Sequence, residues 1–414
     1  MSTILDLVHL HEFWRSRTIN LLASENILSP QVLEALGSDL SSRYSLEIHA
    51  EVHGEYVENA YRGTKFSEEI IHRAEKLACE VFGCRYAVTD ALSGHVAGMV
   101  ALLSSMRKND LLLTTAIDYG GYDGYTENYF PEMFGYRSGH LPYDEEQWRM
   151  SEEAPDTIRK EKPGGVVIGS SFILLPYDVR ALREACDDVG ARLLYDASHV
   201  LGLIAGGEFQ PDAMKYCDIV YGSTHKSFFG PQGGLLLTND EELFERMRFN
   251  LTWRTIDNPH LNRIAGLGIA LEEMKKWSGE YASQVVRNSK ALGSALAGKG
   301  VPVKHAPEFT MSHQLHLDSE LVKERFGLSM NELGIRLEEY DLIADAVGRF
   351  GTAEVTRIGM KEQDMGTLAG FIERALAGRY QDRQGGTDGR GKGGLAHHEV
   401  REFRGQFGLE FTLG

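Results

Sequence analysis

Between about residue 65 and residue 275 the chain alternates short apolar runs with amphipathic segments, and this alternation constrains the fold more than any other feature. It predicts strands at 85–89, 111–115, 165–169, 192–196, 218–221 and 234–237. The helices predicted between them are 67–82, 94–106, 177–188 and 240–249. Repeated βαβ units form a mainly parallel sheet covered by helices, so the predicted fold class is α/β.

The predicted sheet belongs to the largest of four regions. We place an N-terminal helix and arm at 1–45, a large domain at 46–278, a smaller C-terminal α+β domain at 279–380, and a Gly-rich linker with a tail at 381–414. Helical patterns at 5–16 and 30–38 mark the first region, and long ones at 259–277 and 280–299 lead into the third. The glycine-rich run at 384–394 predicts a flexible linker. Apolar side chains in the tail predict docking on a surface, namely Val400, Phe403, Phe407 and Phe411.

Composition limits the classes of partner that this 414-residue chain is expected to bind. The net charge of −17 and the lack of a basic face argue against nucleic acid, whose binding requires neutralised phosphates. No apolar run approaches about 18 residues and no basic segment precedes an apolar one at the N-terminus. We therefore expect no membrane partner and a cytoplasmic protein. The four cysteines, Cys79, Cys84, Cys186 and Cys217, form no CxxC pair, which favours buried thiols in a reducing compartment.

Two charged residues lie at or just past the ends of predicted strands. Asp196 ends the 192–196 run, and Lys226 follows the 218–221 run within STHKSFFGPQG at 223–233. In open α/β sheets, ligands bind beyond the carboxyl ends of the strands. A lysine that bonds to a carbonyl cofactor, with an acid to pair a pyridinium nitrogen, is typical of pyridoxal 5′-phosphate (PLP) chemistry. The alternatives are a structural lysine in a loop and an aspartate that caps the next helix.

A phosphate site is expected beside this pair. Ser93, Gly94 and His95 open a predicted helix after the 85–89 strand, and the backbone N–H groups of a helix N-terminus suit a phosphate. Thr224, with Ser223 before it, offers a second set of donors to the same phosphate. Ser93 also fits an ordinary N-cap residue, so both interpretations stand.

Four segments resemble motifs of the serine hydroxymethyltransferase family, in the same order and at similar spacing. They are LLASEN at 21–26, DASHVLGL at 196–203, STHK at 223–226 and RFGT at 349–352. The chain is therefore identified as a divergent member of that family or of its aldolase and transaldolase relatives. The resemblance implies PLP fold-type I, PLP as the cofactor, and a homodimer with shared active sites.

The resemblance also assigns residues near the cofactor. Tyr122 stands where the family has a histidine stacked on the PLP ring, and an aromatic side chain still covers the ring without imidazole acid/base chemistry. Ser171 and His199 match residues beside the cofactor, although a lone histidine after a strand is often a satisfied core residue. Asn258 stands in a turn that, in the family, reaches the neighbouring subunit's phosphate. In the helix after Ser93, this chain has Val96 and Gly98 where the family has polar residues.

On the substrate side, Arg349 matches the arginine that binds a substrate carboxylate. A guanidinium–carboxylate pair would orient an α-amino acid, and a solvent-facing arginine is the alternative. Ser24 of the N-terminal motif is predicted to contact the substrate as well. Tyr44 and Tyr61 match two tyrosines that line the site, one of them across the dimer interface.

An insertion at 47–55 makes the stretch between the two tyrosines longer than in the family. It shifts the family's acid/base glutamate, so that Leu46 stands at its place and Glu47 is the candidate one step further on. The alternative for this segment is a solvated acidic loop. His49, Glu51 and His53 alternate here, but they lack the HExxH order and an obvious third ligand, so no metal is assigned.

The resemblance implies a PLP-dependent enzyme that acts on an amino acid and an aldehyde. The first hypothesis is an aldol-type transferase that cleaves a serine- or threonine-like β-hydroxy amino acid and transfers a glycyl quinonoid to an aldehyde. The second is folate-dependent serine hydroxymethyltransferase, and the third is an oxidative or inactive regulatory member. The short loop at 338–348 and the shifted glutamate favour the first over the second. The presence of Lys226, Asp196 and Arg349 argues against an inactive member.

Overall fold

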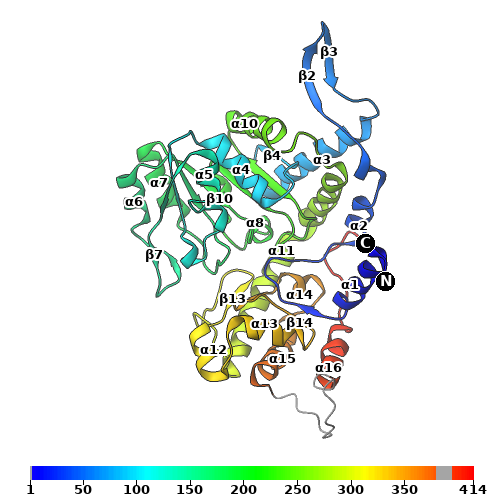
Figure 1. Cartoon of the computed structure of the whole chain (residues 1–414), viewed down its shortest axis with the longest axis vertical. Helices are drawn as coiled ribbons and strands as arrows, with labels where there is room; N and C mark the ends of the chain where they lie inside the picture. The colour runs from blue at the N-terminus through cyan, green and yellow to red at the C-terminus, as the bar shows by residue number, and fades with distance from the viewer. Residues whose placement is uncertain (1, 379–393) are drawn as a thin grey trace. The chain divides into compact units, whose positions relative to one another are not determined.

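The computed structural model describes residues 2–378 and 394–414, so most of the predicted Gly-rich linker lies outside the described residues. The chain divides into two compact units (Figure 1). We call Asn26–Ala282 with Thr412–Gly414 the large unit, and Met1–Glu25 with Ser283–Phe411 the small unit. Among the described residues, no helix combines the length and the apolar character needed to cross a bilayer.

The large unit contains a seven-stranded sheet. Its order is β4 (Tyr86–Val88), β12 (Gly234–Thr238), β11 (Ile219–Ser223), β10 (Arg192–Asp196), β9 (Gly165–Ile168), β5 (Leu111–Thr114) and β6 (Arg137–His140). The strands from β11 to β6 run parallel, and β12 is antiparallel to both of its neighbours. This arrangement confirms the mainly parallel α/β fold. The edge strand β6 was not predicted, because its sequence RSGH contains no apolar run.

The buried face that supports the site lies under two helices. Strand residues Leu194, Ile219, Tyr221 and Leu236 share one hydrophobic core with residues of α4 (Gly94–Ser105) and α10 (Glu241–Leu251). Side chains alternate along a strand, so Asp196 points to the same side as Leu194. The end of β10 therefore presents Asp196 toward the α4 side of the sheet.

The other helices of the large unit connect or cover these strands. They are α2 (Pro30–Leu36), α3 (Lys65–Phe82), α5 (Phe130–Phe134), α6 (Ala154–Glu161), α7 (Val179–Val189), α8 (Leu201–Ala205) and α9 (Ala213–Tyr216). Single turns lie at η1 (Asp39–Ser42), η2 (Ile117–Tyr119), η3 (Asp123–Tyr125) and η4 (Thr252–Ile256), and a small ladder pairs β7 (Tyr143–Asp144) with β8 (Arg149–Met150).

The insertion at 47–55 is not the solvated loop that was the alternative for it. Strands β2 (Glu47–Val52) and β3 (Glu55–Asn59) form an antiparallel hairpin that projects from the rest of the large unit (Figure 1). The two connecting residues have positive φ values, 53° at His53 and 85° at Gly54. This backbone conformation matches the two-residue turns that suit the strand twist of a hairpin.

The small unit is built from short paired strands and helices. Strand β1 (Ile19–Asn20) pairs parallel with β14 (Leu342–Ile343), and β13 (Gln314–His316) pairs antiparallel with β15 (Arg349–Gly351). The helices are α1 (Ile4–Arg15), α12 (Ser319–Phe326), α13 (Met330–Glu338), α14 (Ala353–Arg357) and α15 (Met365–Ala377), with a turn at η5 (Glu362–Asp364).

The two helices predicted at 259–277 and 280–299 form one helix, α11 (Leu261–Gly298). Ser278 and Gly279 at the expected break stay helical, because one glycine costs a helix only about 1 kcal/mol relative to alanine. The backbone at this point also packs closely: a Cβ on Gly206 would lie 2.4 Å from the Ser278 carbonyl oxygen.

The tail packs on the small unit through α16 (Gly394–Arg404). Val400 is buried, and the Phe403 ring lies 5.5 Å from the Phe371 ring between centroids. Arg401 Nε donates to Asp341 Oδ2 at 2.6 Å. Apolar contacts and a charged hydrogen bond thus hold the segment that follows the linker.

Candidate active site

The loop after β11 holds Lys226 in a closed turn. The Gly230 N–H donates to the Thr224 carbonyl at 2.7 Å, and the Thr224 hydroxyl donates to the Pro231 carbonyl at 2.6 Å. Thr224 is fully buried. The structure therefore does not bring the predicted phosphate ligand Thr224 into the pocket, because its hydroxyl closes the loop that carries the lysine.

Lys226 itself lines a pocket at the carboxyl ends of β10 and β11. Its Nζ lies 3.3 Å from Nε2 of His199, which is 6% exposed. The Lys226 carbonyl accepts a hydrogen bond from Asn26 Nδ2 at 2.8 Å. The backbone of the lysine is thus fixed while its amine faces an imidazole.

The same pocket collects most of the residues predicted near the cofactor. Its predicted members are Gly94, His95, Tyr122, Ser171, Asp196, His199 and Lys226. Three further serines line it, Ser170, Ser198 and Ser223. An amine, a carboxylate, two imidazoles and several hydroxyls therefore converge at one end of the sheet.

The N-terminus of α4 forms one wall of this pocket. Ser93 is its N-cap residue, and its Oγ accepts from the Val96 N–H at 3.1 Å, as the ordinary capping interpretation expected. Gly94 follows, and a Cβ there would lie 2.2 Å from Ser223 Oγ. The glycine therefore lets the helix N-terminus approach the end of β11, a combination of N–H groups and a hydroxyl that suits a phosphate.

Asp196 accepts three hydrogen bonds. Its Oδ1 accepts from the Ser198 N–H at 3.1 Å and the Ser198 hydroxyl at 2.6 Å, and its Oδ2 accepts from the Tyr125 hydroxyl at 2.7 Å. An ionised carboxylate has about four lone-pair sites, so an acceptor position remains for a ligand. The aspartate is thus held in place and can still pair with a cationic ring nitrogen.

Tyr122 and His95 form a second polar pair in the pocket. The Tyr122 hydroxyl lies 2.8 Å from His95 Nδ1. Burial lowers the pKa of His95 below its usual value and raises the pKa of Tyr122. The neutral imidazole and the protonated phenol are therefore the favoured forms at neutral pH, and they can exchange a proton.

Other predicted residues of the large unit lie outside this pocket. The rings of Tyr44 and Tyr61 contact each other with centroids 5.3 Å apart, and both are exposed. Glu47 lies 3.1 Å from His72 Nε2 and lines a different pocket with Asp257. Asn258, next to Asp257, is likewise not among the residues that line the pocket of Lys226. The structure does not bring these four residues to Lys226 within one chain.

Arg349 and Ser24 belong to the small unit. Arg349 is 9% exposed and lies in β15 opposite His316 of β13. Its Nε donates to Asp345 Oδ2 at 2.9 Å, and its N–H donates to Asp345 Oδ1 at 3.0 Å. Asp345 therefore fixes the orientation of a largely buried guanidinium.

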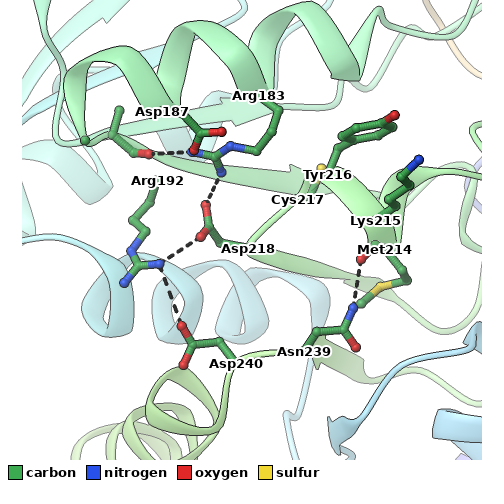
Figure 2. Close-up of a pocket in the computed structure, with 12 residues that line it drawn as sticks. Arg183, Asp187, Arg192, Met214, Lys215, Tyr216, Cys217, Asp218, Asn239 and Asp240 are labelled. Carbon is green, nitrogen blue, oxygen red and sulfur yellow. Dashed lines mark hydrogen bonds and ion pairs between the residues drawn. The ribbon is translucent and has the colours of Figure 1, made fainter.

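A wider pocket of about 570 Å³ lies at the amino ends of β10 and β11, opposite the pocket of Lys226 (Figure 2). Its charged groups contact one another: Asp218 accepts from Arg183 at 2.6 Å and from Arg192 at 2.8 Å. Figure 2 shows Asp187 and Asp240 completing this ion-pair cluster. Mutual pairing accounts for these side chains, so we do not place the reaction there.

The described part of the chain contains no group of three or more His, Cys, Asp or Glu side chains arranged to hold a metal ion. Glu47 lies 3.2 Å from His49 Nε2, and both belong to the hairpin strand β2.

Comparison with known proteins identifies the family. The serine hydroxymethyltransferase family profile matches residues 2–372. The serine hydroxymethyltransferase of Methanobrevibacter smithii is 36% identical, covering 96% of this chain and 92% of that protein. This chain belongs to the serine hydroxymethyltransferase family. The enzyme of that name from Pyrococcus furiosus is 33% identical, over 90% of each chain.

A solved structure also shares the fold. The L-threonine transaldolase from Pseudomonas fluorescens in its internal aldimine state superposes with a TM-score of 0.85. The alignment covers 99% of this chain and 92% of that one at 22% identity. The fold is therefore PLP fold-type I, as the motifs implied.

Membership in the serine hydroxymethyltransferase family makes the chain a PLP-dependent transferase. The pocket fits this cofactor by its chemistry. Lys226 offers the amine, Asp196 offers an anion for the pyridine nitrogen, and the Gly94 end of α4 offers N–H donors for the phosphate.

Sequence reasoning missed four residues around this pocket. Ser170 precedes the predicted Ser171, and Ser198 stands within the quoted DASH motif, so both could have been found by their place after a strand. Tyr125 and Tyr221 gave no such signal. Tyr125 ends the short turn η3, and Tyr221 fits an ordinary buried strand residue.

Proposed function

We propose that this serine hydroxymethyltransferase family member catalyses an aldol-type transfer. A β-hydroxy-α-amino acid of the serine or threonine class would lose its side chain as an aldehyde, and the remaining glycine unit would add to a second aldehyde. In the first step the Cα–Cβ bond breaks and the β-hydroxyl loses its proton. In the second step a new bond forms from Cα to the carbonyl carbon of the acceptor, whose oxygen takes up a proton.

The observation that carries this proposal is the grouping of Lys226, Asp196 and the Tyr122–His95 pair in one pocket. Bound PLP supplies an electron-accepting ring that takes up the electron pair left on Cα. Lys226 would hold the cofactor and yield to the substrate amine. Asp196 would pair with the pyridine nitrogen, and Ser171 and His199 would contact the cofactor at the Lys226 side.

Tyr122 and His95 are suited to move the proton of the β-hydroxyl. The Tyr122 hydroxyl and His95 Nδ1 lie 2.8 Å apart, and partial desolvation lowers the pKa of His95 and raises that of Tyr122. A neutral imidazole behind a phenol can accept a proton and return it to the acceptor oxygen. Glu47, the acid/base candidate by resemblance, contacts His49 and His72 instead. Within one chain, the Tyr122–His95 pair is therefore the acid/base pair that lines the pocket of Lys226.

The remaining roles rest on the family resemblance. Arg349 would bind the substrate α-carboxylate, and Ser24 would contact the same substrate. Tyr44, Tyr61 and Asn258 would complete a neighbouring active site in a homodimer. The exposure of the Tyr44 and Tyr61 rings, 54% and 42%, is consistent with burial by a partner subunit.

Folate-dependent serine hydroxymethyl transfer is the alternative. The similar proteins from Methanobrevibacter smithii and Pyrococcus furiosus, 36% and 33% identical, carry the name serine hydroxymethyltransferase, which supports this alternative. Against it stand the short loop at 338–348 and the tyrosine at position 122.

The discriminating experiment mixes the PLP-loaded protein with serine, with threonine or with glycine, each with and without tetrahydrofolate. Our proposal predicts threonine cleavage without folate and serine turnover that folate does not accelerate. Tight tetrahydrofolate binding in the presence of glycine, together with folate-dependent serine turnover, would restore the alternative.

A further inference from the structure

Asp196 has a tyrosine as its direct neighbour in the sheet. In the parallel ladder of β10 and β11, Asp196 is the register partner of Tyr221. Residues paired in this way direct their side chains to the same face, here the α4 face. Tyr221 is fully buried there and lies at the carboxyl end of the central strands, beside the candidate active site.

A second tyrosine connects this neighbour to the carboxylate. The Tyr125 hydroxyl is in hydrogen-bond contact with the Tyr221 hydroxyl and donates to Asp196 Oδ2 at 2.7 Å. Because Tyr125 has one proton and gives it to the carboxylate, Tyr221 must be the donor in the contact between the phenols. The chain of donors therefore runs from Tyr221 through Tyr125 to Asp196.

Both phenols remain donors over the whole physiological pH range. Burial raises the pKa of Tyr125 and of Tyr221 well above the usual value, and the charge of Asp196 acts in the same direction. Hydrogen bonds in such a chain polarise one another, so the donor that reaches the carboxylate is strengthened by the one behind it.

Gly98 provides the space for the two phenols. A Cβ at this position would lie 3.2 Å from the Tyr125 hydroxyl oxygen and 3.4 Å from a ring carbon of Tyr221. The sequence places this glycine where the family has a polar residue. The departure at position 98 is thus matched by a buried tyrosine pair that occupies the space above the helix.

The other carboxylate oxygen is held from the opposite side. The Ser198 hydroxyl donates to Asp196 Oδ1 at 2.6 Å and accepts from the Ser223 N–H at 3.0 Å. Ser223 is the residue that approaches Gly94 at the N-terminus of α4. Ser198 therefore links the pyridine end of the proposed cofactor site to its phosphate end.

We propose that Tyr125, supported by Tyr221, is a positioning residue that orients Asp196 toward the pyridine nitrogen of PLP, and that Ser198 fixes the other oxygen. The inference rests on the proposed role of Asp196 but not on the identity of the substrate. A carboxylate clamped from both sides cannot rotate away from the ring. Removal of either hydrogen-bond donor would therefore weaken the binding of PLP, even in the absence of substrate.

The test measures the dissociation constant of PLP from the full-length protein by absorbance titration of the apoprotein. Tyr125→Phe keeps the ring and removes the donor, and we expect PLP to bind about tenfold more weakly or worse. The titration of the bound cofactor's visible absorbance with pH should shift as well. Ser198→Ala and Tyr221→Phe should weaken PLP in the same direction, Tyr221→Phe by less because it acts through Tyr125.

Tyr195→Phe is the matched control. Tyr195 is fully buried next to Asp196, yet within the described residues its hydroxyl has no hydrogen-bond partner. This variant should bind PLP within about twofold of the unmodified protein, because it removes no donor from the carboxylate. If Tyr125→Phe does not fold, Ser198→Ala and Tyr221→Phe still report on the clamp by the same measurement.

A double-mutant cycle separates positioning from general packing. In an Asp196→Asn background, Tyr125→Phe should change the PLP dissociation constant by less than about threefold, because its partner is gone. An equal loss with and without Asp196, or no loss beyond that of Tyr195→Phe, overturns the inference. Failure of aldehyde transfer alongside an intact cycle would instead reject the proposed reaction and leave the clamp standing.

Discussion

Lys226 Nζ lies 3.3 Å from His199 Nε2. This contact connects the segments that follow two neighbouring parallel strands. Lys226 comes after β11 and His199 after β10, and these strands pair in register. The contact explains why residues twenty-seven positions apart form one pocket. It also means that the side chain proposed to hold PLP is positioned by the sheet itself.

Replacing the lysine tests its proposed covalent role. Lys226→Ala should abolish turnover and leave PLP bound only non-covalently, because no other amine lines the pocket among the described residues. Borohydride reduction of the unmodified protein, followed by peptide mass mapping, should place the cofactor on Lys226. Lys215→Ala serves as the control, because Lys215 is an exposed residue of α9 in the pocket at the amino ends of β10 and β11. A label on any other lysine would refute the assignment.

Arg349→Lys tests substrate recognition. A lysine cannot reproduce the two parallel hydrogen bonds of a guanidinium, so the KM for amino acids should rise by about tenfold or more while PLP affinity changes little. Steady-state kinetics and cofactor titration measure the two effects separately. Arg325→Lys, on the exposed face of α12, should change neither. Equal losses of substrate and cofactor affinity would indicate a structural arginine.

Because Glu354 is largely buried, we predict that the free energy of unfolding depends on pH. Burial raises its pKa from 4.5 to about 7, while the Asn20 amide, 2.6 Å away, partly opposes this shift, and Arg15, Glu25 and Arg404 are the other charged groups nearby. Between these two values the folded state keeps a proton that the unfolded state has lost. The free energy of unfolding should therefore fall as the pH rises through this window.

Glu354→Gln should remove that part of the slope. At pH 8 the variant should melt roughly 2 °C above the unmodified protein, and at pH 4 the two should melt together. Thermal denaturation across the pH range measures this difference. Glu69→Gln, with a side chain 57% exposed, is the control that should leave the slope unchanged. Identical slopes for Glu354→Gln and the unmodified protein would contradict the raised pKa.

The sequence alone was sufficient for the central sheet, because its buried strands are continuous apolar runs. Leu193 and Leu194 in β10, or Ile219 and Val220 in β11, have no other plausible environment. The edge strand β6 and the hairpin β2–β3 escaped prediction, because an exposed strand has no apolar run to reveal it. Ser278 and Gly279 suggested a helix break that packing does not require.

The candidate site was predictable where a residue lies at or just past the carboxyl end of a buried strand. Asp196 and Lys226 are of this kind, and the pocket contains both. Tyr125 could not be found in this way, because its role depends on a loop that brings its hydroxyl to Asp196 across 71 positions of sequence. Glu47 was chosen by analogy in spacing; in one chain it lies 3.1 Å from His72 Nε2, and its acid/base role stays a prediction.

The most direct test of the proposed reaction follows the carbon atoms. The PLP-loaded protein is incubated with L-threonine labelled with ¹³C at the carboxyl carbon and Cα, together with benzaldehyde, and the products are resolved by mass spectrometry. Our account predicts a new β-hydroxy amino acid that carries both labelled carbons and the phenyl group, formed without tetrahydrofolate and absent with Lys226→Ala. If no labelled transfer product appears, and serine is turned over only when tetrahydrofolate is added, the central claim is wrong.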